Sequence, residues 1–120
     1  MVSFEAFRAV DGAPVYLQII NFIKRGAIAG TIRDGDELPS RRVLSALLGI
    51  NPNTVQKAFH ILEEEHLMES RTGAKSCMTL PPDTLDALRR EVLSDELRAM
   101  ARTLRQLGIS KEEALRLIEQ

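Results

Sequence analysis

LPSRRVLSALLGINPNTVQKAFHIL, which runs from Leu38 to Leu62, is the stretch that decides the fold of this chain. It has the pattern of two short helices joined by a tight turn. Ser40 precedes an apolar-periodic run, so its hydroxyl is placed to cap the first helix by accepting from a free backbone N–H. The apolar residues of this helix recur at helical spacing, which predicts one apolar face made of Val43, Leu44, Leu47 and Leu48.

The turn between the two helices is specified from both sides. Gly49 can adopt the left-handed conformation that helix ends favour, so it predicts the end of the first helix. Asn51 is a good N-cap for the next helix, and Pro52 fits the first helical position because an N–H there would be unpaired anyway. Two helices joined by so short a turn are typical of a helix-turn-helix motif.

The second helix has two faces of opposite character. Its apolar residues predict an inward face made of Val55, Ala58, Phe59 and Leu62. The residues that share the opposite face by i,i+3 and i,i+4 spacing are Asn53, Gln56, Lys57 and His60. Asn and Gln side chains can pair with an adenine edge in the major groove, and Lys can reach guanine or a phosphate.

Charge is distributed unevenly along this stretch. Between Leu38 and Leu62 there is no acidic residue, and the basic residues are Arg41, Arg42 and Lys57. The three acids Glu63 to Glu65 follow at once. An ordinary solvated helix face would explain the polar residues alone, but together with the tight turn they favour a recognition helix that enters a DNA groove.

An amphipathic helix is predicted before this motif. Pro14 suits its first position, and its apolar stripe consists of Tyr16, Ile19, Ile20, Ile23 and Ala27. The preceding arm contains Phe4 and Phe7, which could pack on the domain or on a partner chain; a partly ordered arm is the other interpretation.

A β-hairpin is predicted after the second helix of the motif. Residues 66–70 and 76–80 contain apolar members on either side of a polar tip with Gly73, which is the pattern of a hairpin. Arg71 and Lys75 flank the tip, where a hairpin could lie along a minor groove or a phosphate strand. The single cysteine, Cys77, is expected to be a small buried apolar residue of this hairpin.

Pro81 and Pro82 mark a boundary, because prolines cannot continue a strand ladder. Asp83 or Thr84 could cap a long helix to about residue 107, whose later apolar residues step close to a heptad: Leu93, Leu97, Met100, Leu104 and Leu107. Ser110 and Glu113 form a capping box for a last helix over 111–120, with Ala114, Leu115, Leu117 and Ile118 inside. Two such helices cannot bury their apolar stripes alone, so we favour packing on a second chain over packing within the chain.

Composition limits the classes of function. At 120 residues the chain has room for one domain with a small appendage, and its net charge of −1 means that any nucleic-acid binding depends on a local basic patch. One cysteine excludes an internal disulfide, and the chain has neither an apolar run long enough to span a membrane nor a secretory signal. We therefore expect a cytoplasmic protein.

No enzyme and no cofactor are expected. The chain lacks a Cys–His–Asp set at workable positions, a phosphate-cradling glycine loop and a carboxylate pair in a predicted cleft. His60 and His66 are not at the i,i+4 spacing of a helical zinc site. The acids Asp34, Asp36 and Glu37 are best explained as turn formers.

The ordered run of motifs resembles the DNA-binding domain of the GntR family of bacterial transcription regulators. The motifs are L-P-S-x-R-x-L at 38–44, G-I-N-P-N-T-V-Q-K-A at 49–58 and L-E-E-E-H-L at 62–67. The N-P-N-T-V-Q variant and the short C-terminal part are similar to the YtrA subfamily. The resemblance implies a winged helix-turn-helix fold, a homodimer and a palindromic operator, and it suggests control of a transporter operon.

We therefore predict a mainly α fold with a small β-hairpin: a winged helix-turn-helix domain at 1–80 and a helical dimerisation appendage at 81–120. The predicted partners are double-stranded DNA and a second copy of the chain. By motif position Arg42 and Gln56 contact DNA with Asn53, Thr54 and Lys57 beside them, Gly73 shapes the wing, and the remaining candidates are Arg41, His60, Arg71 and Lys75. The alternative is a winged-helix protein-interaction module that does not read DNA, which the Glu63–Glu65 run and the near-neutral charge would favour.

Overall fold

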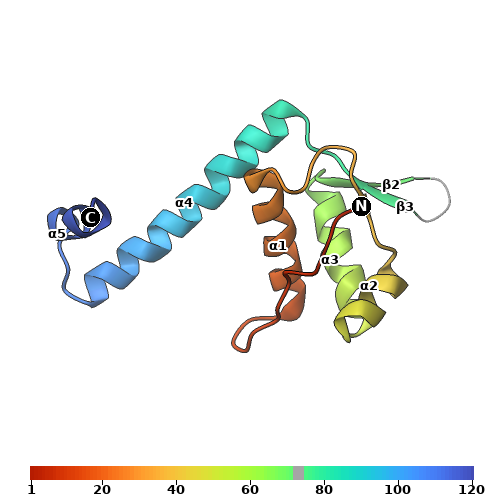
Figure 1. Cartoon of the computed structure of the whole chain (residues 1–120), viewed down its shortest axis with the longest axis horizontal. Helices are drawn as coiled ribbons and strands as arrows, with labels where there is room; N and C mark the ends of the chain where they lie inside the picture. Colours follow the sequence, from red (N-terminus) through yellow and green to blue (C-terminus); the bar gives the residue numbers. More distant parts are fainter. Residues whose placement is uncertain (72–74) are drawn as a thin grey trace. The chain divides into compact units, whose positions relative to one another are not determined.

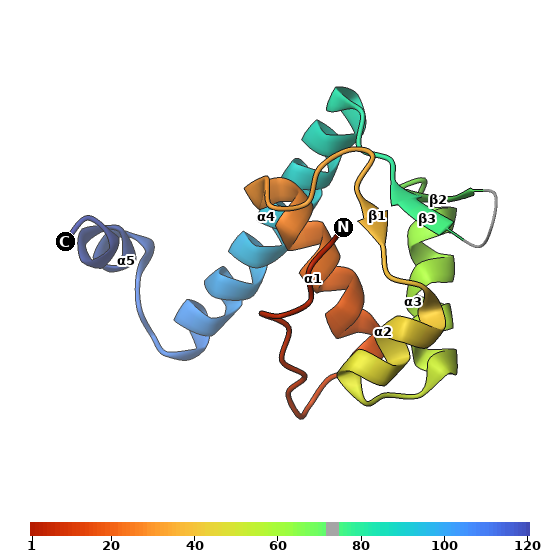
Figure 2. The ribbon, with the colours of Figure 1, turned by 45° about the vertical axis from the view of Figure 1, so that its right-hand side comes forward.

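The computed structural model describes residues 1–71 and 75–120 and separates into two compact units, Met1–Asp86 and Ala87–Gln120. The elements lying wholly in the first unit are α1 (Val15–Ala29), β1 (Glu37–Leu38), α2 (Arg41–Leu48), α3 (Pro52–Glu64), β2 (Met68–Arg71) and β3 (Lys75–Met78) (Figures 1 and 2). Helix α4 (Pro82–Gln106) continues from the first unit into the second, which α5 (Lys111–Ile118) completes. The fold is mainly helical with a small sheet, as predicted; the division at residue 80 stays a prediction.

The caps of the helix-turn-helix are those that the sequence predicts. Ser40 Oγ accepts a hydrogen bond from the N–H of Val43 at 3.2 Å, which caps α2. Gly49 has φ of +66°, so it ends α2 in the left-handed region that a side chain would disfavour. Asn51 Oδ1 accepts from the N–H of Asn53 at 2.8 Å, and Pro52 is the first residue of α3. The turn geometry is therefore fixed by local hydrogen bonds.

The predicted inward face of α2 is partly wrong. Leu44 and Ser45 are buried and Leu48 is half-buried, whereas Val43 and Leu47 are 47% and 68% exposed. Ser45 can face inward because its hydroxyl donates to the carbonyl of Ile50 at 2.5 Å. A buried hydroxyl with a partner escapes most of the cost of leaving water, and this bond also closes the turn.

The core of the first unit forms where α3 packs against α1 and α2 (Figures 1 and 2). Helix α3 contributes the four residues that the sequence predicts, Val55, Ala58, Phe59 and Leu62. Helix α1 contributes Ile19, Ile20, Ile23 and Ala27, whereas Tyr16, also expected in this stripe, is only half-buried. The core thus holds α3 from one side and leaves its polar side exposed.

Three helix ends differ from the predictions, and so do the hairpin strands, which run over Met68–Arg71 and Lys75–Met78 rather than 66–70 and 76–80. Pro14 is the N-cap of α1 rather than its first residue, because its ψ of 137° is extended. Helix α4 begins at Pro82, ahead of the predicted caps Asp83 and Thr84. Helix α5 ends at Ile118, two residues before the predicted end. Differences of one or two residues are usual at helix ends, where backbone groups lack partners.

The sheet has the order β1-β3-β2 and is antiparallel throughout (Figure 2). Its register sets Glu37 and Glu69 on either side of Cys77, and Arg71 opposite Lys75. Cys77 is buried, as predicted. The hairpin of β2 and β3 is the predicted wing, and α3 leads directly into it.

The N-terminal arm packs on its own domain. The N–H of Val2 donates to the carbonyl of Glu37 at 2.7 Å, beside β1. The Phe4 ring stacks on the Phe22 ring of α1 with centroids 5.2 Å apart, and the Phe7 ring meets Phe22 edge-on at 5.5 Å. Of the interpretations left open by the sequence, packing on the domain is the one observed.

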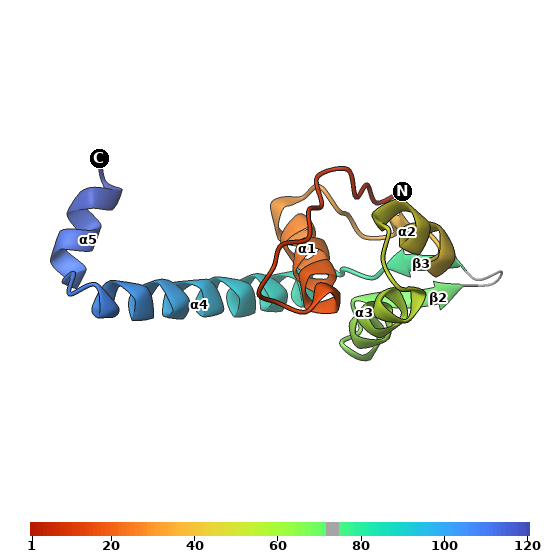
Figure 3. The ribbon, with the colours of Figure 1, turned by 90° about the horizontal axis from the view of Figure 1, so that it is seen from below.

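In the second unit, α5 turns away from the axis of α4 after Gly108 (Figure 3). Ser110 Oγ accepts from the N–H of Glu113 at 3.1 Å, so the Ser110 half of the predicted capping box forms. Of the four residues expected inside α5, only Ala114 is buried. Across the described ranges 1–71 and 75–120, no helix combines the length and apolar character needed to span a membrane.

Candidate nucleic-acid interface

The exposed side of α3 presents two amide side chains without partners. Asn53 and Gln56 are exposed, and neither side chain has a hydrogen bond to any part of the chain that the structure describes. Thr54 beside them is half-buried. The cap at the start of α3 and the buried face behind it fix the direction in which this surface points. Such amides can form paired hydrogen bonds with base edges.

Lys57 and His60 lie on the same side of α3 but have partners within the chain. Lys57 Nζ lies 4.0 Å from the centroid of the Tyr16 ring, which α1 supplies. His60 Nε2 lies 2.5 Å from Glu64 Oε1, one turn further along the helix. Both pairs are near the surface, where such contacts are weak and a phosphate can replace them.

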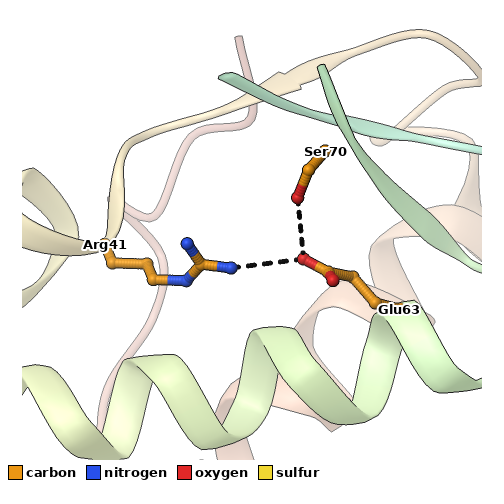
Figure 4. Close-up of polar contacts among 3 residues, drawn as sticks. All are labelled: Arg41, Glu63 and Ser70. Carbon is orange, nitrogen blue, oxygen red and sulfur yellow. Dashed lines mark hydrogen bonds and ion pairs between the residues drawn. The ribbon is translucent and has the colours of Figure 1, made fainter. Parts of the chain in front are cut away.

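The two adjacent arginines of α2 have different surroundings. Arg42 is exposed and, among the described residues, has no ion pair or hydrogen bond from its guanidinium. Arg41 Nη2 instead lies 3.2 Å from Glu63 Oε1, and that oxygen also accepts from Ser70 Oγ at 3.1 Å (Figure 4). Arg42 is therefore available to a ligand, whereas Arg41 is engaged inside the domain.

The wing presents two cations, each beside an acid. Arg71 Nη2 lies 3.5 Å from Glu69 Oε1, and Lys75 Nζ lies 4.0 Å from Glu37 Oε1. All four side chains are largely exposed, so these pairs contribute little and can be exchanged for other anions. Gly73, predicted to shape the wing, lies outside the described residues.

Taken together, α3 offers amides for base edges, while α2 and the wing offer cations for phosphates. The sequence did not identify Tyr16, Glu63 and Ser70 as neighbours of these groups. The spacing of Tyr16 predicts a core residue, and Glu63 stands out in the sequence only as part of an acidic run. Their roles come from contacts between separate elements, which periodicity does not reveal.

Residues 15–75 match the family described as bacterial regulatory proteins, gntR family. The chain is 29% identical over 102 residues to the HTH-type transcriptional regulator YhcF of Bacillus subtilis, covering 85% of this chain and 84% of YhcF. It is 41% identical over 63 residues to the HTH-type transcriptional repressor YtrA of the same organism, covering 52% of this chain and 48% of YtrA. The likeness to YtrA agrees with the predicted subfamily.

The fold agrees with these sequence relationships. A GntR family transcriptional regulator from Listeria monocytogenes superposes with a TM-score of 0.83 at 28% identity, covering 92% of this chain and 97% of that one. These relatives are regulators rather than enzymes. The family match spans both helices of the motif, β2 and the first residue of β3, which together carry the candidate interface. The chain therefore belongs to the GntR family, as a transcription regulator with a DNA-binding helix-turn-helix domain.

Proposed function

We propose that this protein is a dimeric repressor that binds a palindromic operator by inserting α3 into the major groove. The observation that carries the proposal is the pair of exposed amides, Asn53 and Gln56, which lack partners in the described chain. These amides can form hydrogen bonds with a base edge without breaking any hydrogen bond within the described chain. Arg42, Lys57, Arg71 and Lys75 would hold the phosphates on either side.

The proposed roles of these residues differ. Gln56 and Asn53 read bases, Thr54 supports them, and Arg42 neutralises a phosphate. Lys57 and His60 leave their present partners to approach the DNA backbone, and the role of Gly73 in shaping the wing stays a prediction from the sequence. The relative named YtrA is a repressor, which supports the direction of control; the extension to a transporter operon rests on that resemblance alone. Because the proposed target is DNA, the proposed place of action is the cytoplasm.

Dimerisation through the C-terminal helices is supported by their exposed apolar side chains. On α4 these repeat at helical spacing as Leu93, Leu97 and Met100, and on α5 they are Leu115, Leu117 and Ile118; Leu107 is exposed in the turn just after α4. Leu97, Met100, Leu115 and Ile118 also border a mainly apolar groove of about 400 Å³ within the second unit. So much apolar surface is unusual on a small monomer and suits an interface with a second chain.

A two-fold axis through this interface would present two copies of α3 to one face of DNA. The half-sites would then lie about one helical turn apart, roughly 34 Å, or a multiple of that distance. The operator would be palindromic because each half-site meets an identical helix.

Selection from a pool of random duplexes tests the proposal directly. We expect the wild-type chain to enrich one inverted repeat, and Gln56→Ala to lose preference at one position of each half-site, at a cost of about 1–3 kcal/mol per base pair read. Gln120→Ala removes an exposed amide far along the sequence from α3 and serves as the matched control. An unchanged preference in Gln56→Ala would remove Gln56 from base readout.

The alternative is a winged-helix module that binds a protein. It is favoured by Arg71 and Lys75, the two cations of the wing that lie beside acids, and by the net charge of −1. The two functions differ in their response to salt, because binding to DNA releases condensed counterions and weakens steeply as salt rises. If the wild-type chain enriches no duplex, and if its residual affinity for DNA does not change with salt concentration, the protein-binding alternative would be supported instead.

A further inference from the structure

We propose that Arg41 and Glu63 form a positioning pair that sets the wing relative to the recognition helix, so that Arg41 assists DNA binding through Glu63 rather than by touching DNA. The proposal rests on the proposed DNA-binding function and replaces the expectation that Arg41 is a direct contact. It concerns three elements that the DNA would meet together: α2, α3 and β2.

One carboxylate oxygen joins these three elements. Glu63 Oε1, near the end of α3, receives Nη2 of Arg41 from α2 at 3.2 Å and the hydroxyl of Ser70 from β2 at 3.1 Å (Figure 4). Hydrogen bonds to a charged acceptor are stronger than neutral ones. Glu63 therefore ties both helices of the motif to the wing through a single atom.

The side chain of Arg41 is 36% exposed and is engaged by residues of its own domain. Its Nε is buried and has no hydrogen-bond partner among the described residues. Its Cζ lies 5.7 Å from the centroid of the Phe59 ring, and Phe59 is a core residue of α3. A phosphate outside the protein cannot reach the buried Nε, and Nη2 is already held by Glu63. The adjacent Arg42 is the arginine that faces outward.

The position of Ser70 matters because the wing's cations follow it. Arg71 is the next residue of β2, and it lies opposite Lys75 of β3 in the register. The hydrogen bond between Ser70 and Glu63 therefore fixes the positions at which Arg71 and Lys75 project from the domain. The pair Arg41–Glu63 is also less exposed, at 36% and 30%, than the wing pairs Arg71–Glu69 and Lys75–Glu37. The Arg41–Glu63 pair is therefore less open to competition from phosphates than the outer pairs are.

The two possible roles of Arg41 predict opposite effects of removing its partner. If Arg41 binds DNA directly, Glu63 holds it back and competes with phosphate, so Glu63→Gln should tighten binding. If the pair positions the wing, Glu63→Gln weakens the hydrogen bonds to Arg41 and Ser70, and DNA binding should fall. Glu5→Gln removes the same charge from an exposed site on the N-terminal arm and is the matched control.

The experiment uses the full chain and a fluorescent duplex carrying the selected inverted repeat, titrated by anisotropy over a salt series. We expect Glu63→Gln to weaken binding about three- to tenfold, and Glu5→Gln to leave it unchanged. Exchanging the charges, Arg41→Glu with Glu63→Arg, restores the contact between the two residues and should return binding to within about threefold of wild type, although position 41 then carries a negative charge.

A conservative variant keeps the test independent of folding. Arg41→Lys retains a cation for Glu63 and removes the buried unpaired Nε, so we expect it to fold and bind like wild type, whereas Arg41→Met should bind like Glu63→Gln. Tighter or unchanged binding by Glu63→Gln, or failure of the charge exchange to rescue, would overturn the proposal. The proposal would also be overturned if Arg41→Met lowered the slope of log K against log salt by about one unit per protomer, because that change marks a lost phosphate contact.

A measurement without DNA separates this proposal from the proposed function. Amide resonances of Ser70, Arg71 and Lys75 should shift in Glu63→Gln and return in the charge exchange, while those of α5 stay in place. If the wild-type chain bound no duplex, the proposed function would fail and these shifts would still test the pair. Wing resonances that do not respond to Glu63→Gln would show that Glu63 does not position the wing.

Discussion

Lys57 of α3 places its ammonium 4.0 Å from the centroid of the Tyr16 ring of α1, so the recognition helix and the first helix are joined at their surface by a cation–π contact. A pair of this kind at an exposed site contributes about 0.5–1 kcal/mol. We expect Tyr16→Leu and Lys57→Met each to reduce stability by about this amount, and the double variant to show a coupling of similar size in urea unfolding. Tyr16→Phe keeps the ring and should retain the coupling with Lys57. If Tyr16→Phe and Tyr16→Leu lost this coupling free energy equally, the face of the ring would not be involved.

His66 has φ of +61°, in the left-handed region, and is the single non-glycine residue with positive φ among those described. This conformation costs a residue with a side chain about 1–2 kcal/mol. Glycine avoids that cost, but it makes the unfolded chain more flexible, and this offsets part of the gain in stability. We expect His66→Gly to stabilise the protein by up to about 1 kcal/mol, measured by urea unfolding. His66→Ala keeps the steric penalty and should not stabilise. A glycine variant no more stable than the alanine variant would contradict this account.

Ser45 Oγ donates to the carbonyl of Ile50 at 2.5 Å from a buried position. Ser45→Ala removes the donor and leaves that carbonyl without the bond that closes the turn, so we expect a loss of about 1–2 kcal/mol in urea unfolding. Ser94→Ala, on an exposed position of α4, is the control and should change stability by less than about 0.5 kcal/mol. A Ser45→Ala variant as stable as Ser94→Ala would show that the bond contributes nothing.

The helix-turn-helix could be predicted from sequence because its determinants are local. Ser40, Gly49, Asn51 and Pro52 act through hydrogen bonds and dihedral angles within a few residues of themselves, and all four occupy the predicted positions. The inward face of α3 was equally predictable, since four apolar residues at helical spacing leave one way to bury them. Local chemistry and one dominant periodicity therefore sufficed for the motif.

What could not be predicted depends on contacts between elements. The apolar pattern of α2 predicts an inward face that includes Val43 and Leu47, but the buried face includes Ser45, whose hydrogen-bond acceptor lies beyond the helix end. The engagement of Arg41 by Glu63 and of Lys57 by Tyr16 likewise joins separate helices. A basic residue on a predicted interface is thus a candidate for DNA contact only until its tertiary partners are known.

Arg42 provides a test of the electrostatic part of the interface. It is exposed and has no acidic partner in the described chain, so a phosphate contact would cost no internal ion pair. We expect Arg42→Ala to lower the slope of log K against log salt by about one unit per protomer, without altering sequence preference. Gln56→Ala should do the reverse, changing preference at an unchanged slope. Anisotropy titrations across a salt series check both, and an unchanged slope for Arg42→Ala would exclude its phosphate contact.

Leu97 provides the test of dimerisation, because it is 63% exposed on α4 and borders the groove against α5. Leu97→Glu would bury an unpaired carboxylate in an apolar interface, and we expect it to weaken self-association at least about a hundredfold in sedimentation equilibrium. The matched control is Leu47→Glu, the same change at a leucine that is 68% exposed on α2, and it should leave the dimer intact. A monomeric Leu97→Glu variant should bind an isolated half-site and the full palindrome with equal affinity per site, because the two recognition helices are no longer linked in one dimer. Dissociation by Leu47→Glu and not by Leu97→Glu would instead place the interface on the winged domain.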